Sequence, residues 1–162
     1  MSFFDSKCLK AINLAEFGLC DDKENQPAYI DTQDKSKWIA EIINPASLAV
    51  DFYAIDNCLC FEGENNNKIS TCDAAIKIEE RKIYFIELKQ RKSKGWISKS
   101  KKQLKSTLDL YRRFDPQPTE HIICCASNSQ RPSAPTSNLG SLRDFKQETG
   151  CKLLVQAKIT LE

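Results

Sequence analysis

The chain has 162 residues, of which 41% are hydrophobic and 28% charged, and its formal net charge is +2. This length suits one domain with a core of ordinary size, and no apolar run is long enough to cross a bilayer. The N-terminal residues lack the features of a signal peptide, so we expect a cytoplasmic protein without membrane association. The only histidine is His121, which excludes zinc proteases with two histidine ligands and acid–base enzymes that need a histidine pair.

The first third of the chain is predicted to form two helices around a polar loop. Residues 5–19 repeat apolar side chains near the helical period, with Gly18 as a stop, and residues 20–30 are polar. Residues 31–43 carry an apolar stripe that favours a second helix. The stripe consists of Trp38, Ile39, Ile42 and Ile43.

The middle of the chain is predicted to form strands. Residues 48–62 are aromatic and β-branched, which is typical of one strand or a hairpin. Residues 69–78 and 82–90 read as two further strands, and the short charged segment between them fits a hairpin turn.

Helices and strands alternate in the rest of the chain. The patterns predict a helix over 98–114, a strand over 121–127, a helix over 141–149 and a strand over 151–161. Strands that follow one another, and then strands joined by helices, predict an α/β (α+β) fold. We expect one domain over residues 1–162, with a mixed sheet of about five strands flanked by helices.

Charge is distributed unevenly along the chain. Residues 1–80 carry 7 Lys and Arg against 15 Asp and Glu, a net charge of −8, and residues 81–113 carry 12 against 2, a net charge of +10. The basic segment exceeds what solubility requires and suits a polyanion such as nucleic acid. The acidic first half suits a basic protein partner.

Three charged residues in the predicted hairpin point to metal-dependent chemistry. Glu87 and Lys89 lie two positions apart on a strand and therefore share a face, and the hairpin can bring Asp73 beside Glu87. Two carboxylates this close repel unless a cation sits between them, and oxygen ligands without histidine suit Mg²⁺ or Mn²⁺. Such a cation polarises a phosphoryl oxygen and acidifies a bound water, while Lys89 stabilises charge developing on the phosphate.

Asp73, followed after thirteen residues by Glu87-Leu88-Lys89, resembles the motif of the PD-(D/E)xK nuclease superfamily, which has the restriction-endonuclease-like fold. In that family the Asp closes one strand of a hairpin, the E-x-K lies on the next strand, and a helix follows. The resemblance spans about residues 36–127 and includes the order of the elements. Cys72 stands where the family usually has proline, which departs from the pattern without changing its chemistry.

The resemblance implies an endonuclease that depends on Mg²⁺ or Mn²⁺ and hydrolyses phosphodiester bonds of DNA, with RNA as the second choice. It implies that Asp73, Glu87 and the backbone carbonyl of Leu88 hold the metal, and that Lys89 is catalytic. An earlier helix often supplies a further glutamate in the family, and Glu41, in the helix expected over 31–43, is placed for this role.

The helix after the E-x-K often holds the phosphate backbone in this family. We expect that role for Lys94, Lys99, Lys101, Lys102, Gln103 and Lys105. Lys101 falls on the same helical stripe as Leu104 and Leu108, so it is expected to reach the sheet near the site. Trp96, just before this helix, either packs in the core or stacks on a base, and packing is favoured.

The chain has eight cysteines, several of them in apolar segments. Because no export signal is present, we expect all eight to be reduced thiols, most of them buried. Cys58 and Cys60 would point to one face of a strand, but no histidine accompanies them and a thiolate metal site is disfavoured.

Two alternatives to an active nuclease stay open. The same fold with an eroded site would be an inactive module that binds nucleic acid or a protein partner, for example as a toxin-neutralising protein. In an unrelated fold, Glu87 and Lys89 would be a surface ion pair on an edge strand and Asp73 a turn residue. A small nuclease that cuts both strands of a duplex usually works as a homodimer, which the sequence neither requires nor excludes.

Overall fold

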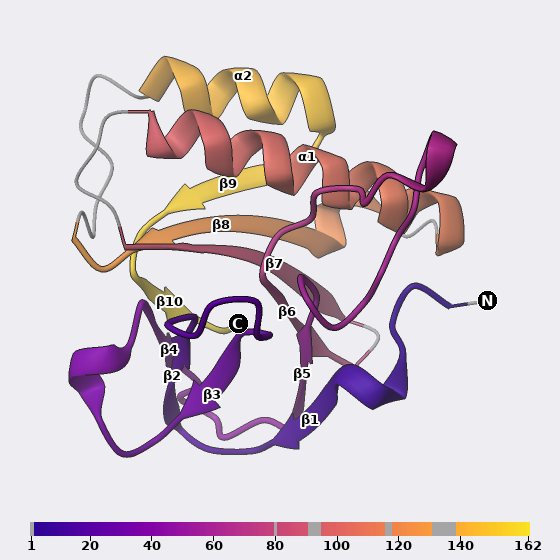
Figure 1. The fold of residues 1–162 in the computed structure, drawn as a ribbon. Helices are drawn as coiled ribbons and strands as arrows, with labels where there is room; N and C mark the ends of the chain where they lie inside the picture. The colour runs from indigo at the N-terminus through magenta and orange to yellow at the C-terminus, as the bar shows by residue number, and fades with distance from the viewer. Residues whose placement is uncertain (1, 80, 91–94, 116–117, 131–138) are drawn as a thin grey trace.

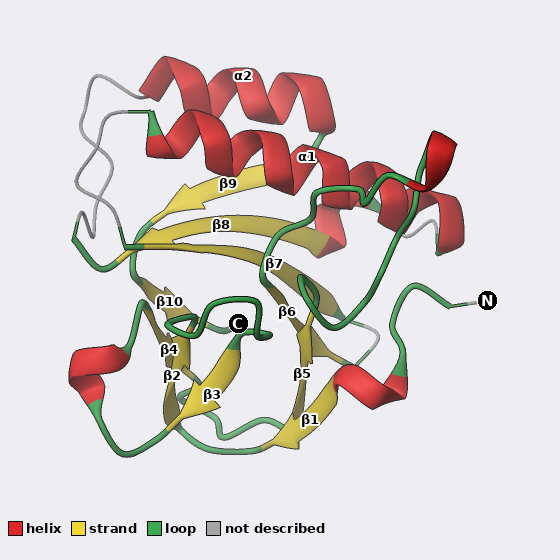
Figure 2. Cartoon of the chain, in the orientation of Figure 1, coloured by secondary structure: helices red, strands yellow, loops and turns green. Residues whose placement is uncertain are grey.

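The computed structural model describes residues 2–79, 81–90, 95–115, 118–130 and 139–162. Two helices cover one face of a six-stranded sheet, and a four-stranded sheet lies against its other face (Figure 1). Figure 2 shows the same arrangement by type of element, with both α-helices on one side of the strands. Within the described ranges, no helix is long and apolar enough to cross a membrane.

The larger sheet has the strand order β1-β5-β6-β7-β8-β9. Its members are β1 (Leu9–Ile12), β5 (Val50–Ala54), β6 (Ala74–Ile78), β7 (Lys82–Lys89), β8 (Ile122–Asn128) and β9 (Lys152–Val155). Pairing is antiparallel from β1 to β7 and parallel from β7 to β9. Parallel neighbours need crossovers, which contain α1 (Trp96–Phe114) and α2 (Leu139–Thr149).

The smaller sheet has the strand order β10-β4-β2-β3. Its members are β2 (Glu16–Cys20), β3 (Tyr29–Asp31), β4 (Ala40–Ile43) and β10 (Lys158–Thr160). Four short 3₁₀ turns complete the described elements: η1 (Ser6–Cys8), η2 (Lys35–Lys37), η3 (Glu64–Asn66) and η4 (Thr119–His121).

The central strand β7 separates two hydrophobic cores. Ile83 and Phe85 face the helices and pack in a core with Leu104 and other residues of α1. Tyr84 and Ile86 face the smaller sheet and pack in the second core. Because strand side chains alternate between faces, Glu87 projects toward the helices at the end of this strand.

The expected fold class is confirmed, since the protein is a mixed α/β (α+β) structure. The hairpin of β6 and β7, the helix α1, the strand β8 and the helix α2 all lie where the sequence predicted them, within a few residues. The strand expected over 48–62 is the shorter β5.

The helices expected over 5–19 and 31–43 are wrong. The first range contains η1, β1 and β2, and the second contains the end of β3, η2 and β4. Pairing across the chain outweighs the apolar spacing, because β1 pairs with β5 and β2 pairs with both β3 and β4. In β4, buried and half-buried residues alternate, as a strand requires.

Gly18 lies inside β2 and does not end a helix. A Cβ atom at this position would lie 2.1 Å from Cγ of Trp38, so a residue with a side chain would displace the indole ring. The Nε1–H of Trp38 also donates a hydrogen bond to Oδ2 of Asp31 over 2.8 Å. These contacts fix the ring against β2.

The sheet content also differs from the expectation of about five strands flanked by helices. The segment 151–161 is two strands, because the chain leaves the larger sheet after β9 and enters the smaller one as β10. Both described α-helices lie on one face, and the second sheet covers the other face (Figure 1).

The expectation of eight free thiols is wrong for Cys8 and Cys58, which form a disulfide with Cα atoms 6.0 Å apart. The other six cysteines are thiols, and Cys60 alone among them is exposed. The bridge joins the end of η1 to the loop after β5, two segments that become neighbours because β1 pairs with β5.

Candidate functional site

The structure brings Asp73, Glu87 and Lys89 together at one end of the β6–β7 hairpin. Ala74 is the partner of Ile86 in the antiparallel pairing of β6 and β7. Asp73 and Glu87 therefore lie opposite each other, one position further along the hairpin. Oδ2 of Asp73 accepts a hydrogen bond from the backbone N–H of Leu88 over 2.7 Å. This bond continues the pairing of the two strands through a side chain, and it fixes the Asp73 carboxyl group beside β7.

Glu87 is the most deeply buried ionisable residue of the group, with none of its surface exposed. The Lys89 ammonium lies 2.8 Å from Oε1 of Glu87, which makes an ion pair. Neither carboxylate oxygen of Glu87 accepts a well-directed hydrogen bond from the described residues. Burying a carboxylate that has one close cation and few hydrogen bonds lowers the stability of the fold. Such a residue is therefore unexpected where only packing is needed.

Lys89 is held from the other side by α1. Its Nζ donates to Oε1 of Gln103 over 2.9 Å, and Nε2 of Gln103 donates to the backbone carbonyl of Thr71 over 3.3 Å. One turn later, Oγ1 of Thr107 accepts from the backbone N–H of Cys72 over 2.7 Å. The helix therefore fixes both the Lys89 side chain and the segment that enters β6.

Burial, above all, raises the pKa of Asp73 to about 7, and the charges of Asp21 and Asp56 raise it further. The Leu88 hydrogen bond and the Lys89 charge act in the opposite direction. Burial is also the main cause that raises the pKa of Glu87 well above its usual range, followed by the charge of Asp73. A neighbouring cation would therefore lower the pKa of both carboxyl groups and favour their ionised forms.

Two further acidic residues approach this pair, and the sequence did not single them out. Asp21 directly follows β2, and Asp56 follows β5 in the loop toward the disulfide. Burial raises the pKa of Asp21, the charge of Asp56 adds to this rise, and hydrogen bonding with Asp73 opposes it. The sequence does place Asp21 and Asp22 directly after an apolar segment. That segment was expected to be a helix followed by a loop, so the two residues were not assigned to the site.

The two carboxyl groups at this edge are oxygen donors of the kind that a hard divalent cation takes. The donors at this edge are carboxylate oxygens of Asp73 and Glu87, and oxygen ligands of this kind suit Mg²⁺ and Mn²⁺. Leu88 donates its N–H toward Asp73, and its carbonyl points to the same side because a strand residue directs both groups one way. Within the described part of the chain, no group of three or more His, Cys, Asp or Glu side chains forms a complete metal-ligand set.

Glu41 lies in β4 of the smaller sheet, where it is paired with Gly18 and Lys158. Its carboxyl group interacts with Glu16, Lys158 and Lys35, and the structure does not bring it into the Asp73 and Glu87 group. The reason is the strand that replaces the expected helix.

The basic residues of α1 are divided between two environments. Lys101 does not reach the sheet, because its Nζ donates to Oγ of Ser141 on α2 over 2.9 Å, and Lys105 pairs with Glu148 on α2. Lys99 and Lys102 are exposed, and Lys102 lines a groove of about 340 Å³ along the helix. Lys94 lies outside the described residues.

Trp96 is 4% exposed and belongs to the core beneath α1, so it does not present a face for base stacking. The indole that lies at the surface is that of Trp38, which is half-buried.

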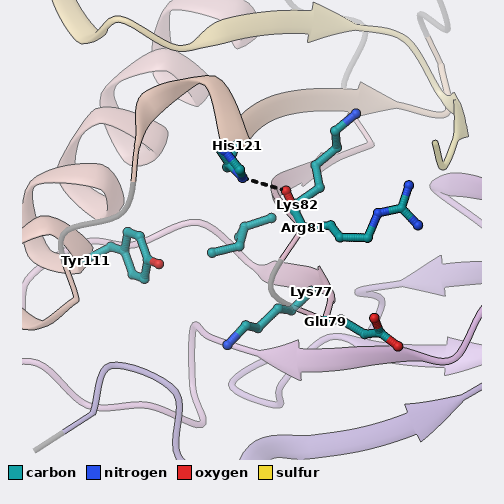
Figure 3. A pocket seen from close by; sticks show the side chains of 7 residues that line it. Lys77, Glu79, Arg81, Lys82, Tyr111 and His121 are labelled. Carbon is teal, nitrogen blue, oxygen red and sulfur yellow. Dashed lines mark hydrogen bonds between the residues drawn. The ribbon is translucent and has the colours of Figure 1, made fainter.

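A separate small pocket lies at the opposite end of the β6–β7 hairpin, around its turn. Figure 3 shows Lys77, Arg81 and Lys82 with His121 and Tyr111 around it. Nδ1 of His121 lies 2.8 Å from the backbone carbonyl of Arg81, so the only histidine ties η4 to the hairpin turn. This pocket shares no residue with the carboxylate group.

No family model matches the chain. No curated protein matches it. No solved structure matches it.

Proposed function

We propose that the chain is a metal-dependent nuclease that hydrolyses phosphodiester bonds of DNA, with RNA as the second choice. The observation that carries this proposal is the fully buried Glu87 carboxylate beside Asp73, with Lys89 as its close cation. Buried charged groups that serve packing alone are rare, because an apolar side chain of similar size costs less.

The order of elements around the group supports the same proposal. Asp73 directly precedes β6, and Glu87 and Lys89 lie at the end of β7. The helix α1 then connects β7 to the parallel strand β8. This is the order expected from the resemblance to the PD-(D/E)xK superfamily.

Asp73 and Glu87, with the carbonyl of Leu88, would hold Mg²⁺ or Mn²⁺. When bound, this cation would supply Lewis acidity toward a phosphoryl oxygen and lower the pKa of a water molecule. The Lys89 ammonium would stabilise the negative charge that develops on the phosphate, and Gln103 orients it for that purpose.

We further propose a cytoplasmic location, DNA contacts through Lys99 and Lys102, and a homodimer where both strands of a duplex are cut. The Cys8–Cys58 disulfide argues against this location, because such bonds are uncommon in a reducing compartment.

A second candidate function is an inactive module that binds a basic protein partner. It is favoured by the acidic first half of the chain, whose acidic side chains lie largely at the surface. The exposed members include Asp5, Glu16, Asp22, Glu24, Asp34, Glu62 and Glu64.

A cleavage panel separates the two candidates. The purified chain is incubated with Mg²⁺, Mn²⁺ or EDTA on duplex, branched and single-stranded DNA and on RNA. We expect cleavage of at least one DNA substrate with a divalent cation, and its loss by at least about 100-fold in Glu87→Gln and Lys89→Ala.

The matched controls are Glu24→Gln and Lys10→Ala, which change the same kinds of charge at exposed positions. Full activity in Glu87→Gln would refute the proposed site. Absence of cleavage of every substrate, together with tight binding of a basic protein, would select the inactive module.

A further inference from the structure

A surface groove lies between the smaller sheet, Ser129 just after β8, and the residues that join β9 to β10. Its volume is about 430 Å³, within the range of roughly 300–1,000 Å³ that is typical of small-molecule sites. Six of its lining residues have side chains that can contact a ligand: Lys35, Trp38, Glu41, Ser129, Gln156 and Lys158. None of them belongs to the carboxylate group at Asp73 and Glu87.

Trp38 gives this groove a preformed aromatic wall. The indole packs on Gly18, where a Cβ atom would collide with the ring, and its N–H is bonded to Asp31. An aromatic ring fixed in this way can stack on a nucleobase without losing further side-chain freedom.

The groove carries both signs of charge, with Lys35 and Lys158 beside Glu41. The Lys35 ammonium lies 5.4 Å from the centroid of the Trp38 ring and 2.9 Å from Oε1 of Glu16. The side chain of Lys35 is 69% exposed, so it can turn toward a phosphate at little cost. Hydrogen bonding with Glu16 is the main cause that raises the pKa of the Glu41 carboxyl group, and the charge of Lys158 acts in the opposite direction. A groove with both signs of charge suits a nucleotide better than a bare phosphate chain.

The Glu41 carboxyl group supplies selectivity among bases. A carboxylate oxygen accepts hydrogen bonds from the exocyclic amino group of cytosine, adenine or guanine, whereas thymine has no such group. Glu41 is half-buried on β4, and its backbone N–H is occupied by the carbonyl of Ala157 over 2.8 Å. This bond fixes the backbone of Glu41 against the junction between β9 and β10, and its carboxyl group interacts with that of Glu16.

The groove is close to the end of β7 that carries Lys89. Ser129 lines the groove, and its backbone N–H donates to the carbonyl of Lys89 over 3.2 Å. On the other side, β2 provides Gly18 beneath Trp38 and then runs on to Asp21, which interacts with Asp73. A DNA strand that leaves the carboxylate group can therefore reach the groove.

We propose that this groove binds one nucleotide of the substrate strand, with an amino-bearing base stacked on Trp38 and hydrogen-bonded to Glu41, and the adjoining phosphate on Lys35 and Lys158. This inference rests on the proposed nuclease function and adds the subsite that positions the strand. Its preference for cytosine, adenine or guanine over thymine follows from the carboxylate acceptor.

Fluorescence of Trp38 tests the subsite without relying on catalysis. The chain contains two tryptophans, so Trp96→Phe leaves Trp38 as the only indole. This variant is titrated in EDTA with single-stranded oligonucleotides of eight cytidines (dC8) or eight thymidines (dT8). We expect saturable quenching of Trp38, and about fivefold tighter binding of dC8 than of dT8.

The matched variants identify the contacts. Trp38→Phe with Trp96 retained should show no quenching, because Trp96 is buried. Lys158→Ala should weaken dC8 binding about two- to fivefold, whereas Lys10→Ala, an exposed lysine on β1, should not. Glu41→Gln should reduce the preference for dC8 over dT8.

Two outcomes would overturn the subsite: no quenching of Trp38 by dC8, or quenching that is equal for Trp38 and Trp96. If cleavage still depends on Glu87 while Trp38 stays unquenched, the subsite alone is refuted. If dC8 quenches Trp38 but no substrate is cleaved, the subsite stands and the catalytic proposal falls.

Discussion

The carboxyl group of Glu87 is fully buried, and the cost of that burial depends on Lys89 and Asp73. The Lys89 ammonium, 2.8 Å away and 15% exposed, partly offsets the cost, and Asp73 increases it. Removing one member of such a pair leaves the other charge buried without compensation, which costs more than the pair itself contributes. Stability measurements on single residues therefore report directly on this group.

The first prediction concerns Asp73 and pH, measured in EDTA. The pKa of Asp73 is raised to about 7, so between about pH 4 and pH 7 the folded protein retains a proton that the unfolded chain has lost. The free energy of unfolding must then fall as pH rises through this window. Asp73→Asn removes this loss, so it should be more stable than the wild type by about 2–4 kcal/mol at pH 8 and similar to it at pH 4.

Thermal unfolding followed by circular dichroism at a series of pH values measures this difference. Asp109→Asn, an exposed substitution on α1, is the control and should leave the pH profile unchanged. A difference between Asp73→Asn and the wild type that does not change with pH would contradict the assignment of a raised pKa to Asp73.

The second prediction concerns the ion pair. Lys89→Met should lower the free energy of unfolding by about 2–3 kcal/mol at pH 7, because it removes the cation that stabilises the ionised form of the buried Glu87 carboxyl group. The double variant Glu87→Gln with Lys89→Met should recover most of this loss. Urea unfolding measures both values. If Lys89→Met costs the same in the wild-type protein as in the Glu87→Gln variant, the two residues are not coupled.

At the level of elements, α1 makes contacts on two sides. One face holds Lys89 through Gln103 and the start of β6 through Thr107, while Lys101 and Lys105 contact α2. The exposed lysines of this helix, Lys99 and Lys102, are available to contact a phosphate backbone.

The third prediction compares these lysines. Lys99→Ala with Lys102→Ala removes two exposed cations and should flatten the dependence of log affinity for DNA on log salt by roughly one to two units. Lys101→Ala with Lys105→Ala removes the same charge from residues engaged with α2, and should change the slope less and the melting temperature more. Salt titrations of fluorescently labelled duplex DNA measure the slopes. Equal slopes for the wild type and the first variant would show that this face does not bind DNA.

The elements that the sequence predicted correctly are those fixed by local pattern. The apolar run in 82–90 and the helical spacing of Leu104 and Leu108 are local features of the sequence, and they place Glu87, Lys89 and Gln103 near one another. A hairpin formed by the segments 69–78 and 82–90 also brings Asp73 opposite Glu87. Local pattern was therefore enough to identify the main residues of the candidate site.

The elements that were missed depend on contacts distant in sequence. β2 and β4 exist because they pair with each other and, in β4, with β10 at the far end of the chain. No local pattern shows that Trp38 covers Gly18, or that Asp21 approaches Asp73. The positions expected for Glu41 and Lys101 were wrong for the same reason, because each depended on where a neighbouring element would pack.

For the molecule as a whole, the disulfide links the N-terminal segment to the loop that leads from β5 toward β6. Cys8 and Cys58 are separated by 50 residues, and the same loop carries Asp56 near the carboxylate group. Closing a loop of this length reduces the entropy of the unfolded chain, which corresponds to about 4 kcal/mol of stability.

The fourth prediction is that Cys8→Ser with Cys58→Ser, or reduction with dithiothreitol, lowers the free energy of unfolding by about 2–4 kcal/mol. Urea unfolding with and without reductant measures the loss, and Cys60→Ser, an exposed thiol two residues away, is the control. Identical unfolding curves in the two conditions would show that the bridge does not form in solution.

The most direct test of the metal-dependent site is the rate of DNA cleavage in Asp73→Asn, Glu87→Gln and the double variant, at saturating Mg²⁺ or Mn²⁺. Two residues that act as one unit lose their contribution together, so the double variant should be no slower than the slower single variant. We predict losses of at least about 100-fold in each single variant and no further loss in the double. Cleavage that persists in both single variants, or losses that multiply in the double, would contradict a shared site at Asp73 and Glu87.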